Sequence, residues 1–324
     1  TDGAGSAVHN AMLHGGVPRF NFSQTWLDHG YKELHIPADN SGKFQMEKNA
    51  LHIWARRSFM MIALPNFDGS FTCTLFLAHK GGNPSGSVGA DLSEPGAVET
   101  GSTAGPQNNT LPTGRVSASI PNFENLSDKS SLDEFFNTNF PDAVPLMPTL
   151  NEDFFSNPVG NLGTVKCFPW NAGGKALLLG DSAHALVPFY GQGMNCAFED
   201  VRVLDSLIEQ QGTDWETVYT HFGQLRKPNT DAIADMAEEN FYEMRDAVAD
   251  PVFVRKRELE TKLEQTFPDY FSKYSMVTFR EDVPYSAAKL QGNAQDQLLM
   301  EICSGVEDLS EIDLNKLMER LRRT

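Results

Sequence analysis

The sequence lacks several features that would place it in common protein classes. No apolar run approaches the roughly 20 residues that span a bilayer, and the first residues show no basic-then-apolar secretory signal. Taken as it stands, the sequence predicts a chain that is neither secreted nor membrane-spanning. Basic residues are few, 26 against 43 acidic ones, and the formal charge of −17 argues against nucleic acid as a partner because it would repel a phosphate backbone.

Cysteine is scarce as well. The four cysteines are widely separated, and they show neither the spacing of metal ligands nor the framework of a small disulfide-bonded domain. We therefore expect reduced, buried thiols and no metal site.

Aromatic residues are missing from residues 80–122. This stretch consists largely of Gly, Ser, Thr, Pro and Asn without a period. Such a composition cannot bury enough apolar surface to offset the entropy of ordering the chain. We interpret residues 80–122 as a disordered insertion.

Strand patterns dominate the first part of the chain and helical patterns the last. Four short segments rich in β-branched and aromatic residues predict an antiparallel meander, at residues 31–38, 51–56, 59–66 and 71–78. Asp68-Gly69 signals a hairpin between the last two, and residues 164–179 resemble a second hairpin. From about Trp215 to the end, apolar residues recur with helical period. The predicted class is α/β (α+β).

Residues 177–207 combine a strand, an acid and glycines. Leu177–Leu179 read as a buried strand, so Gly180-Asp181 would lie at its carboxyl end, where open α/β sheets bind ligands. Gly191 and Gly193 let the backbone approach a flat ligand closely, and Gly193–Asn195 would form a first helical turn with unpaired N–H groups. A ligand with a hydroxylated chain and a ring that becomes anionic would fit.

A simpler interpretation of this segment remains open. Asp181 could serve only as a helix cap, and the glycines could serve only as turns. His184 is more simply explained as a structural histidine packed behind the loop than as a proton donor.

The same residues carry a family resemblance. The stretch GDSAHALVPFYGQGMN resembles the second flavin-binding motif of the aromatic-hydroxylase class of FAD monooxygenases, and DGAGSAV at residues 2–8 is similar to the Asp-Gly loop of that class. Seven further segments, in order, resemble the kynurenine 3-monooxygenase family: HGYKELHIP, LHIWAR, FMMIALPN, SFTCTLF, FPDAVPL, NFYEMRDAV and YSMVTF. The resemblance runs from Asp2 to about Ser286, interrupted by the polar insertion.

The resemblance implies an activity and a domain plan. The activity is hydroxylation of L-kynurenine to 3-hydroxykynurenine with NADPH, FAD and O2 through a C4a-hydroperoxyflavin, a step of tryptophan catabolism and NAD biosynthesis. No catalytic acid or nucleophile is expected of the protein, because the cofactor performs the chemistry. The implied fold is a partial FAD-dependent aromatic hydroxylase fold. Its parts are the end of the FAD-binding domain (1–18), the substrate-domain sheet (19–163), the second part of the FAD-binding domain (164–212) and a C-terminal helical region (213–324).

Matched positions imply the site residues. Asp181, Met194 and Asn195 would bind FAD together with Gly191 and Gly193, and the backbone near Ala7 would make a weaker contact; residues 188–190 would shape the wall above the ring. Asn240 and Tyr274 match the family's substrate contacts and would hold the amino-acid end of kynurenine. The alternatives are that Asn240 only bonds to solvent or a neighbouring carbonyl, and that Tyr274 only packs.

Departures from the family leave other functions open. The strand with a Gly-x-Gly-x-x-Gly turn, which cradles the dinucleotide pyrophosphate, does not occur in this sequence. The chain is thus expected to be a truncated form of a longer enzyme, or else a non-catalytic fragment or pseudoenzyme; a related flavin hydroxylase of another aromatic acid is a further alternative. The resemblance implies the outer mitochondrial membrane, but the C-terminus is charged, so a cytoplasmic location stays open. The oligomeric state is not apparent from the sequence.

Overall fold

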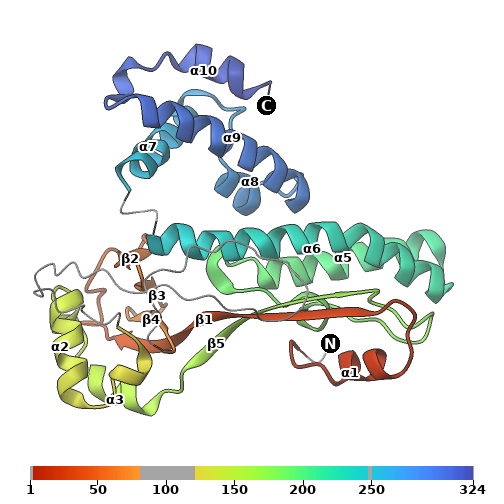
Figure 1. Cartoon of the computed structure of the whole chain (residues 1–324), viewed down its shortest axis with the longest axis horizontal. Helices are drawn as coiled ribbons and strands as arrows, with labels where there is room; N and C mark the ends of the chain where they lie inside the picture. Colours follow the sequence, from red (N-terminus) through yellow and green to blue (C-terminus); the bar gives the residue numbers. More distant parts are fainter. Residues whose placement is uncertain (1–2, 81–120, 247–249, 324) are drawn as a thin grey trace, which may run out of the picture.

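The computed structural model describes residues 3–80, 121–246 and 250–323 (Figure 1). The predicted disordered insertion falls almost wholly outside these residues. The strands are β1 (Asn21–Ile36), β2 (His52–Ala55), β3 (Met60–Pro65), β4 (Phe71–Ala78) and β5 (Gly160–Phe168). The helices are α1 (Ala7–His14), α2 (Lys129–Asn139), α3 (Leu150–Ser156), α4 (Asp181–His184), α5 (Gly193–Gln211), α6 (Trp215–Asp246), α7 (Pro251–Thr266), α8 (Lys273–Phe279), α9 (Tyr285–Gly305) and α10 (Leu314–Leu321), with short 3-10 helices η1 (Phe123–Asn125), η2 (Val144–Leu146), η3 (Pro188–Tyr190) and η5 (Leu309–Glu311). None of the helices in these ranges has both the length and the apolar character needed to cross a membrane.

The five strands form one antiparallel sheet in the order β2-β3-β4-β1-β5. The four predicted strand segments and the turn at Asp68-Gly69 are confirmed, with Gly69 at a φ of 87°. The predicted meander is correct only for β2-β3-β4. The strand β1 is long enough to pair with β4 along its second half and with β5 along most of its length, so it lies between them.

The predicted strand at Leu177–Leu179 is wrong in detail. Leu177 forms only an isolated bridge to Asn171, and the Leu178 amide donates to the Trp170 carbonyl at 2.7 Å. Pro169 has no N–H group, so the partner segment cannot extend this pairing into a ladder. Gly180-Asp181 therefore follows an extended but irregular segment rather than a regular strand.

The sheet has one covered face and one face turned toward the rest of the molecule. Leu34, Ile36 and Phe71 pack with Leu132 and Phe136 of α2 in a core that also includes α3. On the other face, Met60 and Phe76 pack against η3 and α6. This second face of the sheet is therefore directed toward η3 and α6.

The predicted helical C-terminal region and the α+β class are confirmed. Figure 1 shows α5 and α6 side by side, with α7 to α10 above α6, and α6 contacts both α5 and α9. The last helices have a core of their own, which includes Leu259, Leu263 and Leu299. The strand β5 runs through residue 163, where a domain boundary was expected, and the division into domains stays a prediction.

Candidate functional site

The turn at Gly180-Asp181 depends on glycine. Gly180 has φ 62° and ψ −141°, a region that is essentially restricted to glycine. It directly precedes the single-turn helix α4, which begins at Asp181. The Asp181 carboxylate therefore lies on a sharp turn, and the Gly180 amide in this turn donates a hydrogen bond to Asp200.

A second glycine segment lies at the start of α5. Gly191 has φ 65°, and Cβ atoms added at Gly191 or Gly193 would meet nothing within 4 Å. Gln192 is the N-cap residue, but its side chain makes no capping hydrogen bond, so it does not satisfy the first-turn amides of α5. A bare backbone surface and the positive end of a 19-residue helix thus lie together.

These two segments border a common cavity of about 630 Å³, which we call the glycine cavity. Its lining residues are Gly3, Gly180, Asp181, Leu186, Pro188, Gly191, Gly193, Met194 and Ala197. Four of the six residues expected to contact the cofactor are therefore brought together: Asp181, Gly191, Gly193 and Met194. Their binding to FAD stays a prediction.

The other two expected cofactor contacts lie elsewhere. The Asn195 side chain donates to Gln192 Oε1 at 3.0 Å and lines a separate hollow with Glu199 and Tyr285. Ala7 begins α1 and is not among the described residues that line the glycine cavity. In this structure Asn195 supports the start of α5 instead of facing the glycine cavity.

A second cavity, of about 590 Å³, lies between the sheet and η3, and we call it the sheet cavity. Its floor is made by side chains of β1, β3 and β4, and its lining includes Phe189, Tyr190 and Tyr274. Leu186, Pro188 and Gly191 line both cavities. One short segment, residues 186–191, is therefore the wall between the two.

The two expected substrate contacts have different positions. Tyr274 lines the sheet cavity and stacks on Tyr190, with ring centroids 5.8 Å apart. Asn240 is not among the described lining residues: its Nδ2 donates to the Phe189 carbonyl at 2.8 Å. Asn240 thus contacts the wall of the cavity from behind, and a role in binding substrate stays a prediction for both residues.

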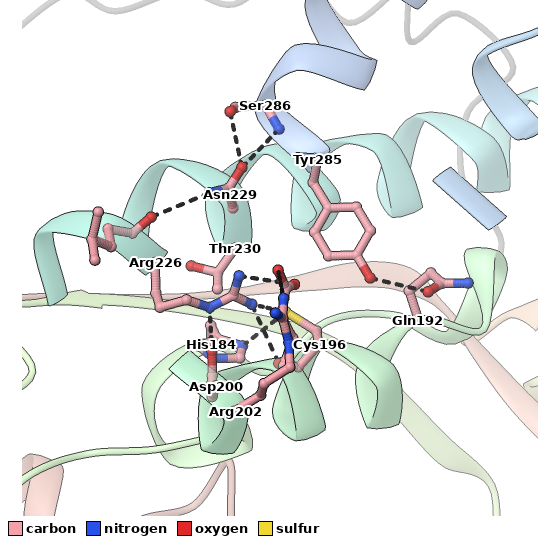
Figure 2. Close-up of polar contacts among 12 residues, drawn as sticks. His184, Gln192, Cys196, Asp200, Arg202, Arg226, Asn229, Thr230, Tyr285 and Ser286 are labelled. Atoms are coloured by element: carbon pink, nitrogen blue, oxygen red, sulfur yellow. Dashed lines mark hydrogen bonds and ion pairs between the residues drawn. The ribbon is translucent and has the colours of Figure 1, made fainter. Parts of the chain in front are cut away.

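A buried group of charged side chains lies behind the glycine cavity, and Figure 2 shows the hydrogen bonds and ion pairs within this group. Asp200 is fully buried and accepts hydrogen bonds from His184 Nε2 at 2.5 Å, Arg226 Nε at 2.7 Å and the Gly180 amide at 3.3 Å. Arg226, 2% exposed, also pairs with Glu199 at 2.8 Å. Asp200 therefore ties the Gly180-Asp181 turn to α5 and α6.

The charges of this group compensate one another. Burial by itself would raise the pKa of the Asp200 carboxyl, but the hydrogen bond from His184 and the contact with Arg226 outweigh burial and lower it. Burial raises the pKa of the neighbouring Cys196 thiol to about 12, so the thiol stays protonated. The ligand atoms of His184, Cys196 and Asp200 are within 4.8 Å of one another, as in a metal site. A cation there would have to displace Arg226, whose guanidinium already contacts Asp200 and Cys196.

Sequence reasoning missed Asp200 and Arg226, because charged residues on helices are usually solvated. On α5, Cys196, Asp200 and Leu207 face the core, whereas Val201 is 52% exposed. A signal was present in α6, where Arg226 follows Val218 and Phe222 at four-residue intervals on the buried face. His184, 2% exposed and packed against Trp170, fits the predicted structural role.

Known proteins match this chain over most of its length. The FAD binding domain family matches residues 161–216. Kynurenine 3-monooxygenase from Myxococcus xanthus is 46% identical over 99% of this chain and 61% of its own length. The protein of that name from Dictyostelium discoideum is 43% identical over 97% of this chain and 62% of its own length. The one from Legionella pneumophila is 34% identical over 99% of this chain and 62% of its own length. The solved structure of 2-methyl-3-hydroxypyridine-5-carboxylic acid oxygenase is 16% identical and covers 89% of this chain and 57% of that chain, with a TM-score of 0.49.

These relatives bear on two expectations. Two of the three are bacterial, so they do not support the outer mitochondrial membrane that the resemblance implied, and the location stays a prediction. The chain spans about three fifths of the length of the curated relatives it matches. Along nearly its whole length, this chain is similar in sequence to curated kynurenine 3-monooxygenases.

Proposed function

We propose that the protein is a FAD-dependent monooxygenase that hydroxylates L-kynurenine to 3-hydroxykynurenine with NADPH and O2. The observation that carries the proposal is the pair of cavities that share residues 186–191 as a wall. A cofactor in one cavity and an aromatic substrate in the other would meet at this wall. The relatives named kynurenine 3-monooxygenase support kynurenine as the substrate.

The glycine cavity fits FAD by the chemistry of its lining. The Asp181 carboxylate can accept hydrogen bonds from ribityl hydroxyls, and the first-turn amides of α5 can donate to the electron-rich edge of the ring. Gly191 and Gly193 leave room for a flat ring against the backbone. When bound, FAD would supply the electron transfer and oxygen activation that side chains cannot supply.

The residues of this chain would then bind and orient. The lining of the sheet cavity is largely apolar, with Ile62, Leu64 and Phe76 on its floor, and it would exclude water from the reacting ring. Phe189 packs on Phe76 with ring centroids 4.9 Å apart, which fixes the wall against the floor. Asn240 would hold the wall through the Phe189 carbonyl, and the Tyr274 hydroxyl would bind the polar end of the substrate.

The test is made on the full-length gene product that contains this sequence. The purified protein is expected to carry FAD, to oxidise NADPH faster when L-kynurenine is added, and to yield a product heavier by one oxygen atom. Colourless protein that gains no activity with added FAD would contradict the proposal. Product from another aromatic acid but not from kynurenine would instead favour a related hydroxylase.

A pair of variants tests the cofactor site. Asp181→Asn removes the anionic acceptor and is expected to weaken FAD binding about tenfold or more, because a charge-assisted hydrogen bond contributes about 1.5–3 kcal/mol. Asp205→Asn is the matched control, since Asp205 is exposed on α5 and does not line the glycine cavity. Equal FAD affinity in the two variants, measured by quenching of flavin fluorescence, would remove Asp181 from the site.

A further inference from the structure

One acidic residue stands out in the lining of the sheet cavity. Among the described residues that line it, Glu33 is the only one with a charged side chain. The other polar groups there are neutral: the hydroxyls of Tyr31, Tyr190, Tyr274 and Thr74, and the amide of Asn161. A cationic group of a ligand would therefore meet one anion in this cavity.

The register of the sheet places Glu33 relative to the wall. Glu33 pairs with Thr74, and Thr74 pairs with Ile62, so these three side chains form one row across the floor. Phe76, which contacts Phe189 of η3, belongs to the neighbouring row, about 7 Å away along the strands. If the aromatic ring of a ligand lies near the wall, Glu33 is one row away from it. An aromatic amino acid is long enough to reach from the wall to Glu33 with its amino-acid end.

The surroundings of Glu33 favour pairing with a ligand over a purely solvated role. Its carboxylate is exposed and makes no hydrogen bond or ion pair with the described part of the chain. Ile62, Leu64 and Leu51 line the same cavity with apolar atoms. A ligand that fills the cavity displaces water from the carboxylate, which is unfavourable unless the ligand brings a positive charge.

From this arrangement we propose that Glu33 is a specificity residue, which pairs with the ammonium group of a zwitterionic aromatic amino acid held in the sheet cavity. This inference rests on the proposed function. It adds that the enzyme selects its substrate partly by the α-ammonium group, and that analogues without this group lose a contact made by Glu33. The residue binds substrate and takes no part in the transfer of oxygen.

The experiment compares two substrates in the full-length gene product, L-kynurenine and its analogue that lacks the α-amino group. Glu33→Gln is expected to lower kcat/KM for L-kynurenine about tenfold or more, mostly through KM, because a charge-assisted contact becomes a neutral one. For the analogue the same substitution should change kcat/KM less than about twofold, since no ammonium is present to lose its partner. Glu33→Asp retains the charge and should keep part of the preference.

The control is Glu134→Gln on α2, which covers the opposite face of the sheet, and Glu134 is exposed. Glu134→Gln should leave kcat/KM unchanged for both substrates. Equal losses for both substrates in Glu33→Gln, or no loss for either, would overturn the inference while the hydroxylase activity of the wild type stands. A wild-type protein that hydroxylates neither compound would overturn the proposed function and this inference with it.

Discussion

Replacing Asp200 by Asn tests the role of the buried charges behind the glycine cavity. The substitution keeps the size of the side chain but removes the negative charge that faces His184 Nε2 at 2.5 Å and Arg226 Nε at 2.7 Å. Breaking a buried ion pair by removing one partner costs about 3–5 kcal/mol. Arg226 keeps Glu199 at 2.8 Å, so we expect the lower end, about 3 kcal/mol of unfolding free energy.

Tryptophan fluorescence is a suitable signal for unfolding. Trp170, one of four tryptophans, is fully buried with its ring centroid 5.3 Å from that of His184, so loss of the packing around the charged group changes its contribution to the signal. Urea unfolding of the wild type, Asp200→Asn and Asp205→Asn would give the comparison. The exposed Asp205 substitution should change stability by less than about 0.5 kcal/mol. An Asp200→Asn protein within about 1 kcal/mol of the wild type would refute the reasoning.

The pH dependence provides a second check of the same variant. The pKa of Asp200 is lowered in the folded protein, since His184 and Arg226 outweigh the effect of burial. A group with a lowered folded pKa stabilises the protein above its unfolded pKa, about 3.9, and loses this contribution as the pH falls through the folded value. The difference in unfolding free energy between wild type and Asp200→Asn should therefore be constant from about pH 7 to 5 and shrink below about pH 4.

Three further predictions follow from the geometry of the site. Gly180→Ala places a Cβ on a backbone at φ 62° and ψ −141°, so it should cost about 1–3 kcal/mol in urea unfolding and weaken FAD binding. Asn240→Ala removes the 2.8 Å hydrogen bond to the Phe189 carbonyl, so it should raise the KM for kynurenine or divert oxygen to peroxide. An oxygen electrode with catalase would reveal the peroxide, and an unchanged KM with unchanged coupling would exclude a role of Asn240 in the site. Burial raises the thiol pKa values of Cys73, Cys167 and Cys196 to about 12. At pH 8 these thiols should therefore resist iodoacetamide in the native protein and react with it in urea, as followed by mass spectrometry.

Local patterns were sufficient for the positions of the four strand segments in the first part of the chain and for part of the site. Alternation in residues 71–78 and the Asp68-Gly69 turn depend on neighbours in sequence, and both are present in the structure. The glycine positions could be predicted for the same reason, because Gly180 and Gly191 adopt positive φ angles that few other residues tolerate. Features that depend only on residues close in sequence could thus be predicted.

The rest depends on contacts between distant segments. The position of β1 between β4 and β5 follows from pairing with a strand more than 120 residues away. The orientation of Asn195 toward Gln192, and of Asn240 toward Phe189, follows from side-chain partners that a motif does not specify. Asp200 on α5 was the hardest case, since its burial is possible only because Arg226, on another helix, lies opposite it.

The buried charges are better explained by orientation than by stability. Apolar residues of similar size often stabilise a core as well as an ion pair does, because both charges must lose their water on burial. An apolar side chain at position 200, however, could not accept the hydrogen bond from the Gly180 amide or fix the ring of His184. The turn that carries Asp181 would then keep its packing but lose the contact that fixes its backbone. We therefore expect Asp200→Leu combined with Arg226→Met to recover stability relative to Asp200→Asn but not affinity for FAD. Recovery of both, measured by urea unfolding and flavin fluorescence, would show that the charged group serves stability alone.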